Sequence, residues 1–308
     1  MADRVGVTAP GAGATALADG TRAPGPVLAP GAASGGELTL IRPARARRRR
    51  GLTITRVPRL ARRAIGPVAA IALWQLVCSR GLFTSFEVAS PVAVFDAARE
   101  LASQGVLQSN LLISLQRVAI GLLLGVGTGV FLAVLCGLFW VGEDLLDPVI
   151  QAFRAVPILG LVPLVIIWFG VGEVPKIFLI ALGCLFPVYL NTYAAIRNVD
   201  NKLVEAGRTF GLSRLGLIFK VILPGALPGF LVGLRFALVA SWVIDVVAEE
   251  INAQSGLGYL INQAQSTNRI DIMFCCLTIY AILGLVADAI VRLLERRLLV
   301  WRVAFAGG

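Results

Sequence analysis

Residues 111–140 read LLISLQRVAIGLLLGVGTGVFLAVLCGLFW, a long and almost uninterrupted apolar run. A helix needs about 20 such residues to cross the hydrocarbon core of a bilayer. The rest of the 308-residue chain repeats this pattern, because 57% of all residues are hydrophobic and only 15% are charged. Soluble domains average about 45–50% apolar and about 25% charged residues. The sequence therefore predicts a membrane protein.

The apolar residues outside this stretch gather into further runs, which predict an all-α polytopic protein with about six transmembrane helices. The predicted spans are residues 64–78, 111–140, 148–169, 176–196, 226–247 and 272–294. An amphipathic segment at residues 92–101 follows the first span. Two rows of glycine recur every four residues, at positions 121, 125 and 129 and at positions 225, 229 and 233. Small residues at this spacing let helices approach closely in lipid, so we expect helix contacts along both rows.

The basic residues outside the apolar runs predict the orientation in the membrane. The net charge is +10, and the Lys and Arg residues cluster in the N-terminal arm, in residues 197–220 and near the C-terminus. Cytoplasmic segments of membrane proteins carry such an excess. We therefore expect residues 1–60 to be a disordered basic cytoplasmic arm, residues 61–300 to be the transmembrane domain, and residues 301–308 to be a cytoplasmic tail. No basic stripe interleaved with aromatic residues suggests a nucleic-acid partner.

Residue types that carry chemistry are scarce. The chain has no His, and its five Cys lie within or at the edge of apolar runs without the spacing of zinc ligands. No phosphate-binding loop with its Lys is present. The sequence therefore predicts no catalytic site, no metal site and no bound cofactor in this chain.

The segment between the fourth and fifth spans, residues 198–225, is polar and basic. Asp200 is expected to be an N-cap, and Leu203, Ala206/Gly207 and Phe210 fall on one face at helical spacing. Gly211 suits a helix end, so we expect a helix–turn–helix at the membrane surface. Pro224 is expected to break the chain before the fifth span, and Ser213 to cap the second short helix. From the residues alone, two interpretations remain open: a basic loop that fixes topology, or an apolar ridge that docks a soluble partner.

This segment resembles the loop that marks permeases of bacterial ABC importers: Glu-Ala-Ala, three residues, Gly, nine residues, then Ile-x-Leu-Pro. The residues that match in register are Glu205, Ala206, Gly211, Leu223 and Pro224, whereas Gly207 replaces the second Ala and Val221 replaces the Ile. The resemblance implies that the loop forms coupling helices that seat in a cleft of the ATPase subunit. The predicted coupling loop comprises Glu205, Ala206, Gly207, Arg208 and Gly211.

Residues 154–170, 223–250 and 255–261 also resemble the nitrate/sulfonate/taurine branch of these permeases, so the resemblance covers about residues 60–300. It implies the type I importer fold in the bacterial inner membrane. It further implies a homodimer bound to two ATPase subunits, which hold ATP and Mg, and an extracytoplasmic substrate-binding protein. The expected cargo is a small anionic solute such as an aliphatic sulfonate or taurine. Nitrate or a pyrimidine- or thiamine-precursor-like molecule is the alternative cargo, and a secondary transporter or a membrane-embedded enzyme is the alternative function.

Charged residues inside a span are costly and are often functional. Arg235 lies near the middle of the fifth span, and Trp242 and Glu249 follow at intervals that put all three on nearly the same face. These three residues are the predicted candidates for the translocation pathway. For Arg235 the alternative is a structural role in an internal ion pair or in hydrogen bonds to carbonyls of a broken helix. Glu249 and Glu250 are expected at the outer end of the span, where a gate or the binding protein would contact them.

Overall fold

The computed structural model describes residues 59–81, 87–299 and 301, and all of them belong to one compact unit. All regular structure within these ranges is helical, which confirms the predicted all-α class. The elements are, in order, α1 (Arg59–Ser79), α2 (Pro91–Ser103), α3 (Val106–Leu138), α4 (Trp140–Arg154), η1 (Ile158–Leu161), α5 (Val162–Phe169), α6 (Glu173–Arg197), α7 (Asn201–Thr209), α8 (Arg214–Leu217), η2 (Ile218–Ile222), α9 (Leu223–Asn252), α10 (Leu257–Ser266) and α11 (Ile270–Leu298). The arm predicted at residues 1–60 and the tail predicted at residues 301–308 lie outside the described residues, apart from residues 59, 60 and 301.

Within the described ranges, four helices are long and apolar enough to cross a membrane: α3, α6, the continuous helix Arg214–Ile251 and α11. A fifth candidate is the bent pair formed by α4 with the segment Ile158–Phe169, and α1 contributes a shorter apolar helix at Ile65–Ser79. The apolar runs of the sequence therefore all become helices, in agreement with the expected count of about six.

The third predicted span is not a straight helix. Residues 148–169 were expected to cross as one element, but α4 ends at Arg154 and the next helical segment continues at an angle of 84°. Pro157 lies at this break, where it precedes η1 with an extended backbone. A proline disfavours the helical conformation of the residue before it and supplies no N–H, so the chain turns at this point.

The expectation that Pro224 breaks the chain is wrong. Pro224 lies in the first turn of α9, and the helix runs without interruption from Arg214. A π-helical turn, η2, directly precedes it. A π-helical adjustment of this kind compensates for the backbone donor that a proline lacks. Since the helix is continuous from Arg214, the fifth span begins well before residue 226.

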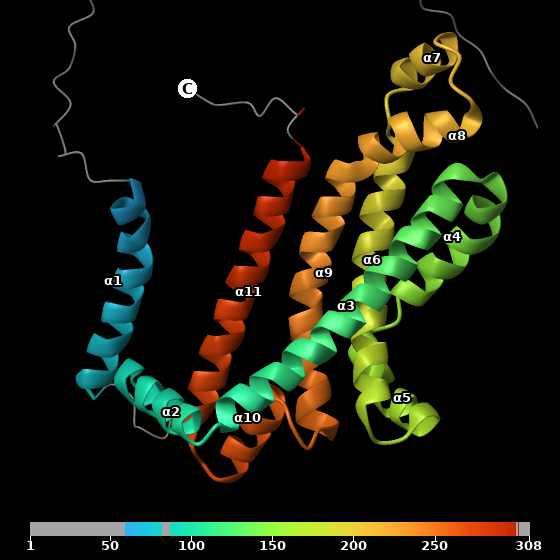
Figure 1. Ribbon diagram of the computed structural model, residues 1–308. Coiled ribbons are helices and arrows are strands. Elements are labelled where there is room, and N and C mark those ends of the chain that lie inside the picture. Colours follow the sequence, from blue (N-terminus) through green and yellow to red (C-terminus); the bar gives the residue numbers. More distant parts are fainter. Residues whose placement is uncertain (1–58, 82–86, 300, 302–308) are drawn as a thin grey trace, which may run out of the picture. The chain divides into compact units, whose positions relative to one another are not determined.

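Both glycine rows make the helix contacts that their spacing predicts. Helix α6 runs beside α9, is crossed by α3 and packs extensively against both (Figure 1). A Cβ atom at Gly129 would lie 2.8 Å from the Leu185 carbonyl oxygen of α6. On the other side, a Cβ atom at Gly233 would lie 2.9 Å from the carbonyl oxygen of Pro187. The absence of side chains at these positions lets the three helix backbones come together.

The two ends of this helix core carry different elements. Helices α7 and α8 connect α6 to α9 at one end, whereas α10 connects α9 to α11 at the other (Figure 1). The amphipathic segment predicted at residues 92–101 is α2, which packs against α11. Arg269, just before α11, pairs with Asp271 and with Glu100 of α2, each at 2.9 Å. The hydrogen bonds that the Arg269 guanidinium donates to Asp271 and Glu100 raise its pKa above the ordinary value.

Candidate functional site

The predicted coupling loop forms the expected pair of short helices. The carboxylate of Asp200 caps α7 by accepting a hydrogen bond from the Lys202 amide at 2.9 Å. The hydroxyl of Ser213 caps α8 by accepting one from the Gly216 amide at 3.2 Å. Between the two helices, Gly211 has a φ of +78°, a left-handed conformation that favours glycine. Local sequence therefore determines both helix starts and the turn between them.

Large apolar side chains on this helix pair are exposed instead of packed. Phe210 is 87% exposed, and Leu203 and Leu215 are also largely exposed. Glu205, Ala206 and Arg208 are also exposed, whereas Gly207 is buried. A Cβ atom at Gly207 would lie 2.7 Å from a methyl group of Leu217, so glycine fits the close packing of α7 on that side chain. The arrangement offers a small apolar surface with a charged border, as a docking helix requires.

The three predicted pathway residues of α9 all face α11. Arg235 pairs with Asp288 at 3.2 Å and with Glu295 at 3.0 Å. Trp242 is buried and packs edge-on against Tyr280, with ring centroids 6.0 Å apart. The hydroxyl of Tyr280 also lies 3.5 Å from the Glu249 carboxylate. The shared face that the spacing predicts is therefore present, and it is a helix-packing face in this conformation.

Arg235 has the internal ion pairs of the alternative interpretation, and its partners Asp288 and Glu295 are on α11. Its part in transport stays a prediction. The same holds for Trp242, which belongs to the main hydrophobic core.

Glu249 lies at the centre of a buried polar network. Its side chain is fully buried, so this conformation does not present it to a soluble partner. The carboxylate accepts hydrogen bonds from Ser114 Oγ at 2.8 Å, from the Gly258 amide at 2.8 Å and from Arg117 Nη1. A buried carboxylate requires this many donors because leaving it unpaired costs several kcal/mol.

Arg117 of α3 joins this network to a second carboxylate. Its Nε and Nη2 atoms both donate to Glu173 at the start of α6, the latter at 2.7 Å. Lys176, one turn further along α6, donates to the same carboxylate at 3.1 Å. Arg117 and Lys176 are both buried, whereas the side chain of Glu173 is 54% exposed. We refer to Arg117, Glu173, Lys176 and Glu249 as the ion cluster.

The segment between α9 and α10 closes over the ion cluster. The carbonyl oxygen of Ser255 accepts from Arg117 Nη1 at 2.7 Å. Gly256 has a φ of +115°, and a Cβ atom there would overlap the Glu249 carboxylate. A Cβ atom at Gly258 would lie 2.7 Å from Glu249 Cβ. The Ser-Gly-Leu-Gly sequence at residues 255–258 therefore allows the backbone to approach a buried charge.

The sequence prediction identified Glu249 but missed its partners. Arg117 was the available signal, since it is a basic residue within the apolar run at residues 111–140. Glu173 and Lys176 lie at the border of a span, where charges are ordinary and carry little information. The described residues contain no group of three or more His, Cys, Asp or Glu side chains that could hold a metal ion.

Comparison with known proteins identifies the family. Residues 125–300, more than half of the chain, match the family described as "Binding-protein-dependent transport system inner membrane component". A permease protein named for aliphatic sulfonates transport, SsuC of Escherichia coli (strain K12), is 46% identical over 78% of this chain and 91% of its own length. SsuC of Bacillus subtilis (strain 168) is 43% identical over 78% of this chain and 87% of its own length. The taurine transport system permease protein TauC of Escherichia coli (strain K12) is 33% identical over 77% of this chain and 89% of its own length.

A solved structure supports the same fold. A chain from an amino acid ABC transporter superposes with a TM-score of 0.55 over 65% of this chain and 97% of that chain, at 21% identity. The expected fold of an ABC importer permease is thereby confirmed. The apolar helices, the paired helices between α6 and α9 and these similarities together show that the chain belongs to the inner-membrane components of binding-protein-dependent ABC importers, as a multi-pass, non-catalytic permease subunit that works with a separate ATPase and a substrate-binding protein.

Proposed function

We propose that this chain forms the translocation pathway for aliphatic sulfonates in an ATP-driven importer. The observation that carries the proposal is the 46% identity to the SsuC permease over 91% of that protein's length. Periplasmic binding proteins contribute much of the selectivity in such systems, so the identity of the permease indicates the class of cargo and not one compound. Taurine is the second candidate, because TauC is 33% identical over a similar range.

The coupling loop is proposed to deliver the energy. Glu205, Ala206, Arg208 and Gly211 would form the surface that seats α7 in a cleft of the ATPase, and the buried Gly207 would hold α7 against Leu217 behind that surface. The exposure of Phe210 and Leu203 supports this role, because apolar side chains at a helix–turn–helix in water favour burial against a partner. ATP and Mg would be bound by the ATPase subunit and not by this chain.

The proposed assembly is a homodimer of this chain with two ATPase subunits. The end that carries α7 and α8 would face the cytoplasm together with both termini. The basic residues of 197–220 support this orientation, since cytoplasmic segments are enriched in Lys and Arg. The opposite end, which carries α2 and α10, would then face the binding protein, and Glu249 would lie near this outer end of the pathway.

Reconstitution tests the proposal directly. Proteoliposomes would contain this chain, its cognate ATPase and its binding protein, and ATP hydrolysis would be measured with taurine, longer alkanesulfonates, nitrate and a pyrimidine precursor. Alkanesulfonates should stimulate hydrolysis, whereas nitrate and the pyrimidine precursor should not. Stimulation by nitrate or the pyrimidine precursor alone would replace the proposed cargo, and a failure to associate with any ATPase would contradict the coupling role.

A further inference from the structure

The ion cluster holds one carboxylate firmly and the other loosely. Glu249 is fully buried and receives hydrogen bonds from Ser114, Arg117 and the Gly258 amide. Within the described part of the chain, Glu173 is held only through the charged groups of Arg117 and Lys176, and its side chain is 54% exposed. A rotation of the Glu173 side chain toward the open side would therefore leave the rest of the cluster in place.

The position of the Glu173 carboxylate is a preformed oxyanion site. Arg117 donates to it through two nitrogens, in the forked geometry by which arginine binds planar or tetrahedral oxyanions. Lys176 adds a third donor at 3.1 Å. Both cations are more than nine-tenths buried, so they stay fixed and poorly hydrated when the carboxylate leaves.

The charges of the cluster favour replacement of the Glu173 carboxylate by another anion over its departure without a replacement. Without Glu173, Glu249 is the one carboxylate among the described residues that is hydrogen-bonded to Arg117. Asp245, one turn earlier on α9, is hydrogen-bonded to Tyr280 at 3.5 Å and acts on Arg117 only through space. Cations buried in protein are costly when they have no balancing negative charge. An incoming anion would restore the balance, and a sulfonate presents three acceptor oxygens with one permanent negative charge.

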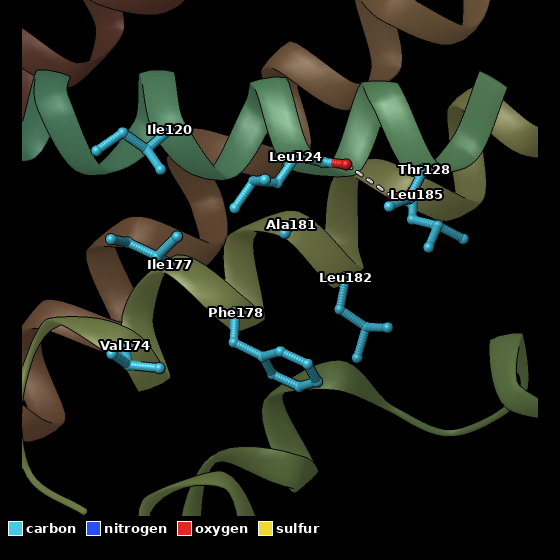
Figure 2. Close-up of a pocket in the computed structure, with 9 residues that line it drawn as sticks. All are labelled: Ile120, Leu124, Thr128, Val174, Ile177, Phe178, Ala181, Leu182 and Leu185. Carbon is cyan, nitrogen blue, oxygen red and sulfur yellow. Dashed lines mark hydrogen bonds between the residues drawn. The ribbon is translucent and has the colours of Figure 1, made fainter. Parts of the chain in front are cut away.

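A cavity of about 350 Å³ lies beside this oxyanion position. Its lining combines polar and apolar groups: Ile113, Gln116, Arg117, Ile120, Glu173, Ile177 and Ser255. Ile120 and Ile177 also line a second cavity of about 560 Å³ between α3 and α6, so the two spaces adjoin. The second cavity is apolar apart from one hydroxyl, that of Thr128, which is bonded back to its own helix (Figure 2).

Together the two cavities match an amphiphilic anion. The polar space would hold a charged headgroup against Arg117 and Lys176, and the apolar space would hold a hydrocarbon chain along Leu124, Phe178 and Ala181 (Figure 2). We propose that this groove between α3 and α6 is an alkanesulfonate-binding site of the permease, in which the sulfonate displaces the Glu173 carboxylate from Arg117 and Lys176. This inference rests on the proposed sulfonate cargo and assigns that cargo a binding site within the permease.

Equilibrium binding tests the site apart from the binding protein. The complex of this chain with its ATPase would be placed in phosphatidylcholine nanodiscs without ATP, and the dissociation constants of radiolabelled ethane-, butane- and octanesulfonate would be measured. Each added methylene that enters the apolar cavity should tighten binding by up to about fourfold.

Glu173→Gln keeps the shape of the side chain but removes the internal competitor. Binding of all three sulfonates should tighten by about tenfold, because an apparent affinity rises with the fraction of sites that are free to bind. Lys176→Gln should weaken all three. Glu100→Gln is the matched control, since Glu100 is also a part-exposed carboxylate paired with an arginine. Equal affinities for Glu173→Gln and Glu100→Gln would overturn the proposal.

Ala181→Leu tests the hydrocarbon part of the groove. The larger side chain should fill the apolar cavity, so the gain in affinity from ethane- to octanesulfonate should shrink while ethanesulfonate binding stays unchanged. Ala281→Leu, an exposed position on α11, should keep the wild-type dependence on chain length. An unaltered chain-length dependence in Ala181→Leu would contradict the assignment.

Two further outcomes are decisive. If phosphatidylglycerol in the nanodisc abolished octanesulfonate binding to the wild type and to Glu173→Gln alike, the groove would be a lipid site and the proposal would be wrong. If the wild-type permease bound no sulfonate while the complete transporter still hydrolysed ATP in response to alkanesulfonates, the site would be refuted and the proposed function would stand. If alkanesulfonates did not stimulate ATP hydrolysis by the complete transporter, the proposed function would be wrong, and the binding site inferred from it would be wrong as well.

Discussion

At the scale of single residues, the ion cluster shows how a charge can be kept inside an apolar helix. Arg117 lies within the longest apolar run, yet every one of its donating nitrogens has an acceptor from Glu173, Glu249 or Ser255. Glu249 is satisfied by a hydroxyl, a backbone amide and this guanidinium. Removing one partner of such a network leaves the others buried and unpaired.

Glu249→Gln should therefore destabilise the protein. The substitution removes the buried negative charge opposite Arg117 and places an NH₂ group among hydrogen-bond donors, so we expect a loss of about 3 kcal/mol. Thermal unfolding of the purified permease in detergent, followed by circular dichroism, would measure it. Glu250→Gln changes the neighbouring, half-buried carboxylate and should have little effect. Equal melting temperatures of the two variants would show that the network contributes no stability.

The structure also leads to a prediction for Arg235, which pairs with two carboxylates of α11. Arg235→Gln should lower the melting temperature, because Asp288 and Glu295 lose a cation, while the KM for alkanesulfonate uptake should stay at the wild-type value. Uptake kinetics in proteoliposomes would be compared at a temperature where both proteins are folded. A raised KM at full stability would instead support the pathway role inferred from the sequence.

At the scale of helices, close backbone contacts hold α3, α6 and α9 together. The described glycines of α3 fall into two kinds: those that face α6 and those that do not. A Cβ atom at Gly125 would collide with the carbonyl oxygen of Ala181, whereas at Gly127 it would meet nothing within 4 Å. The two positions are two residues apart on one helix, so they share backbone conformation and surroundings in the chain.

This pair gives a matched test of helix packing. Gly125→Ala should destabilise the protein by about 1–3 kcal/mol, because the backbone of α6 must shift to make room. Gly127→Ala should be neutral or stabilising by up to about 1 kcal/mol, since alanine favours the helix. Thermal unfolding of both variants would be compared. Similar destabilisation by the two substitutions would contradict the α3–α6 contact.

At the scale of the whole molecule, the described residues place two candidate sites at opposite ends of the α6–α9 pair. The coupling loop follows α6 and precedes α9, whereas the ion cluster joins the start of α6 to the end of α9. Each helix of this pair therefore has one end in each site. Any movement of the loop that tilts α6 against α9 would act on the contacts of Arg117 as well.

Docking of the ATPase should depend on the loop alone. Glu205→Lys reverses a charge on the exposed surface of α7 and should reduce co-purification of the ATPase and abolish substrate-stimulated hydrolysis. Asp96→Lys makes the same change on the exposed face of α2, at the other end of the bundle, and should leave co-purification intact. Normal association of the Glu205→Lys permease with its ATPase would refute the coupling-loop assignment.

The helices and the helix pair of the coupling loop could be predicted from the sequence, because their signals lie within short stretches of the chain. Hydropathy identified the helices, since a segment in lipid must satisfy its own backbone hydrogen bonds. The helix pair of the coupling loop was predicted from Asp200, Ser213 and Gly211, because helix caps and turns depend on residues that are close together in the chain. The glycine rows predicted close helix contacts, although not which helices would meet.

Only the tertiary structure decided what lies far apart in the chain. The pairing of Arg117 with Glu249 joins residues 132 positions apart, and no property of either residue names the other. The bend at Pro157 and the continuous helix through Pro224 show two prolines with opposite effects, set by whether the surrounding turns can compensate for the missing donor. The sequence correctly predicted that Arg235 and Trp242 share one face of their helix. It did not predict that this face packs against α11, because α11 lies far away in the chain. Burial and charge pairing are properties of several elements at once, and for that reason they become defined only when those elements pack.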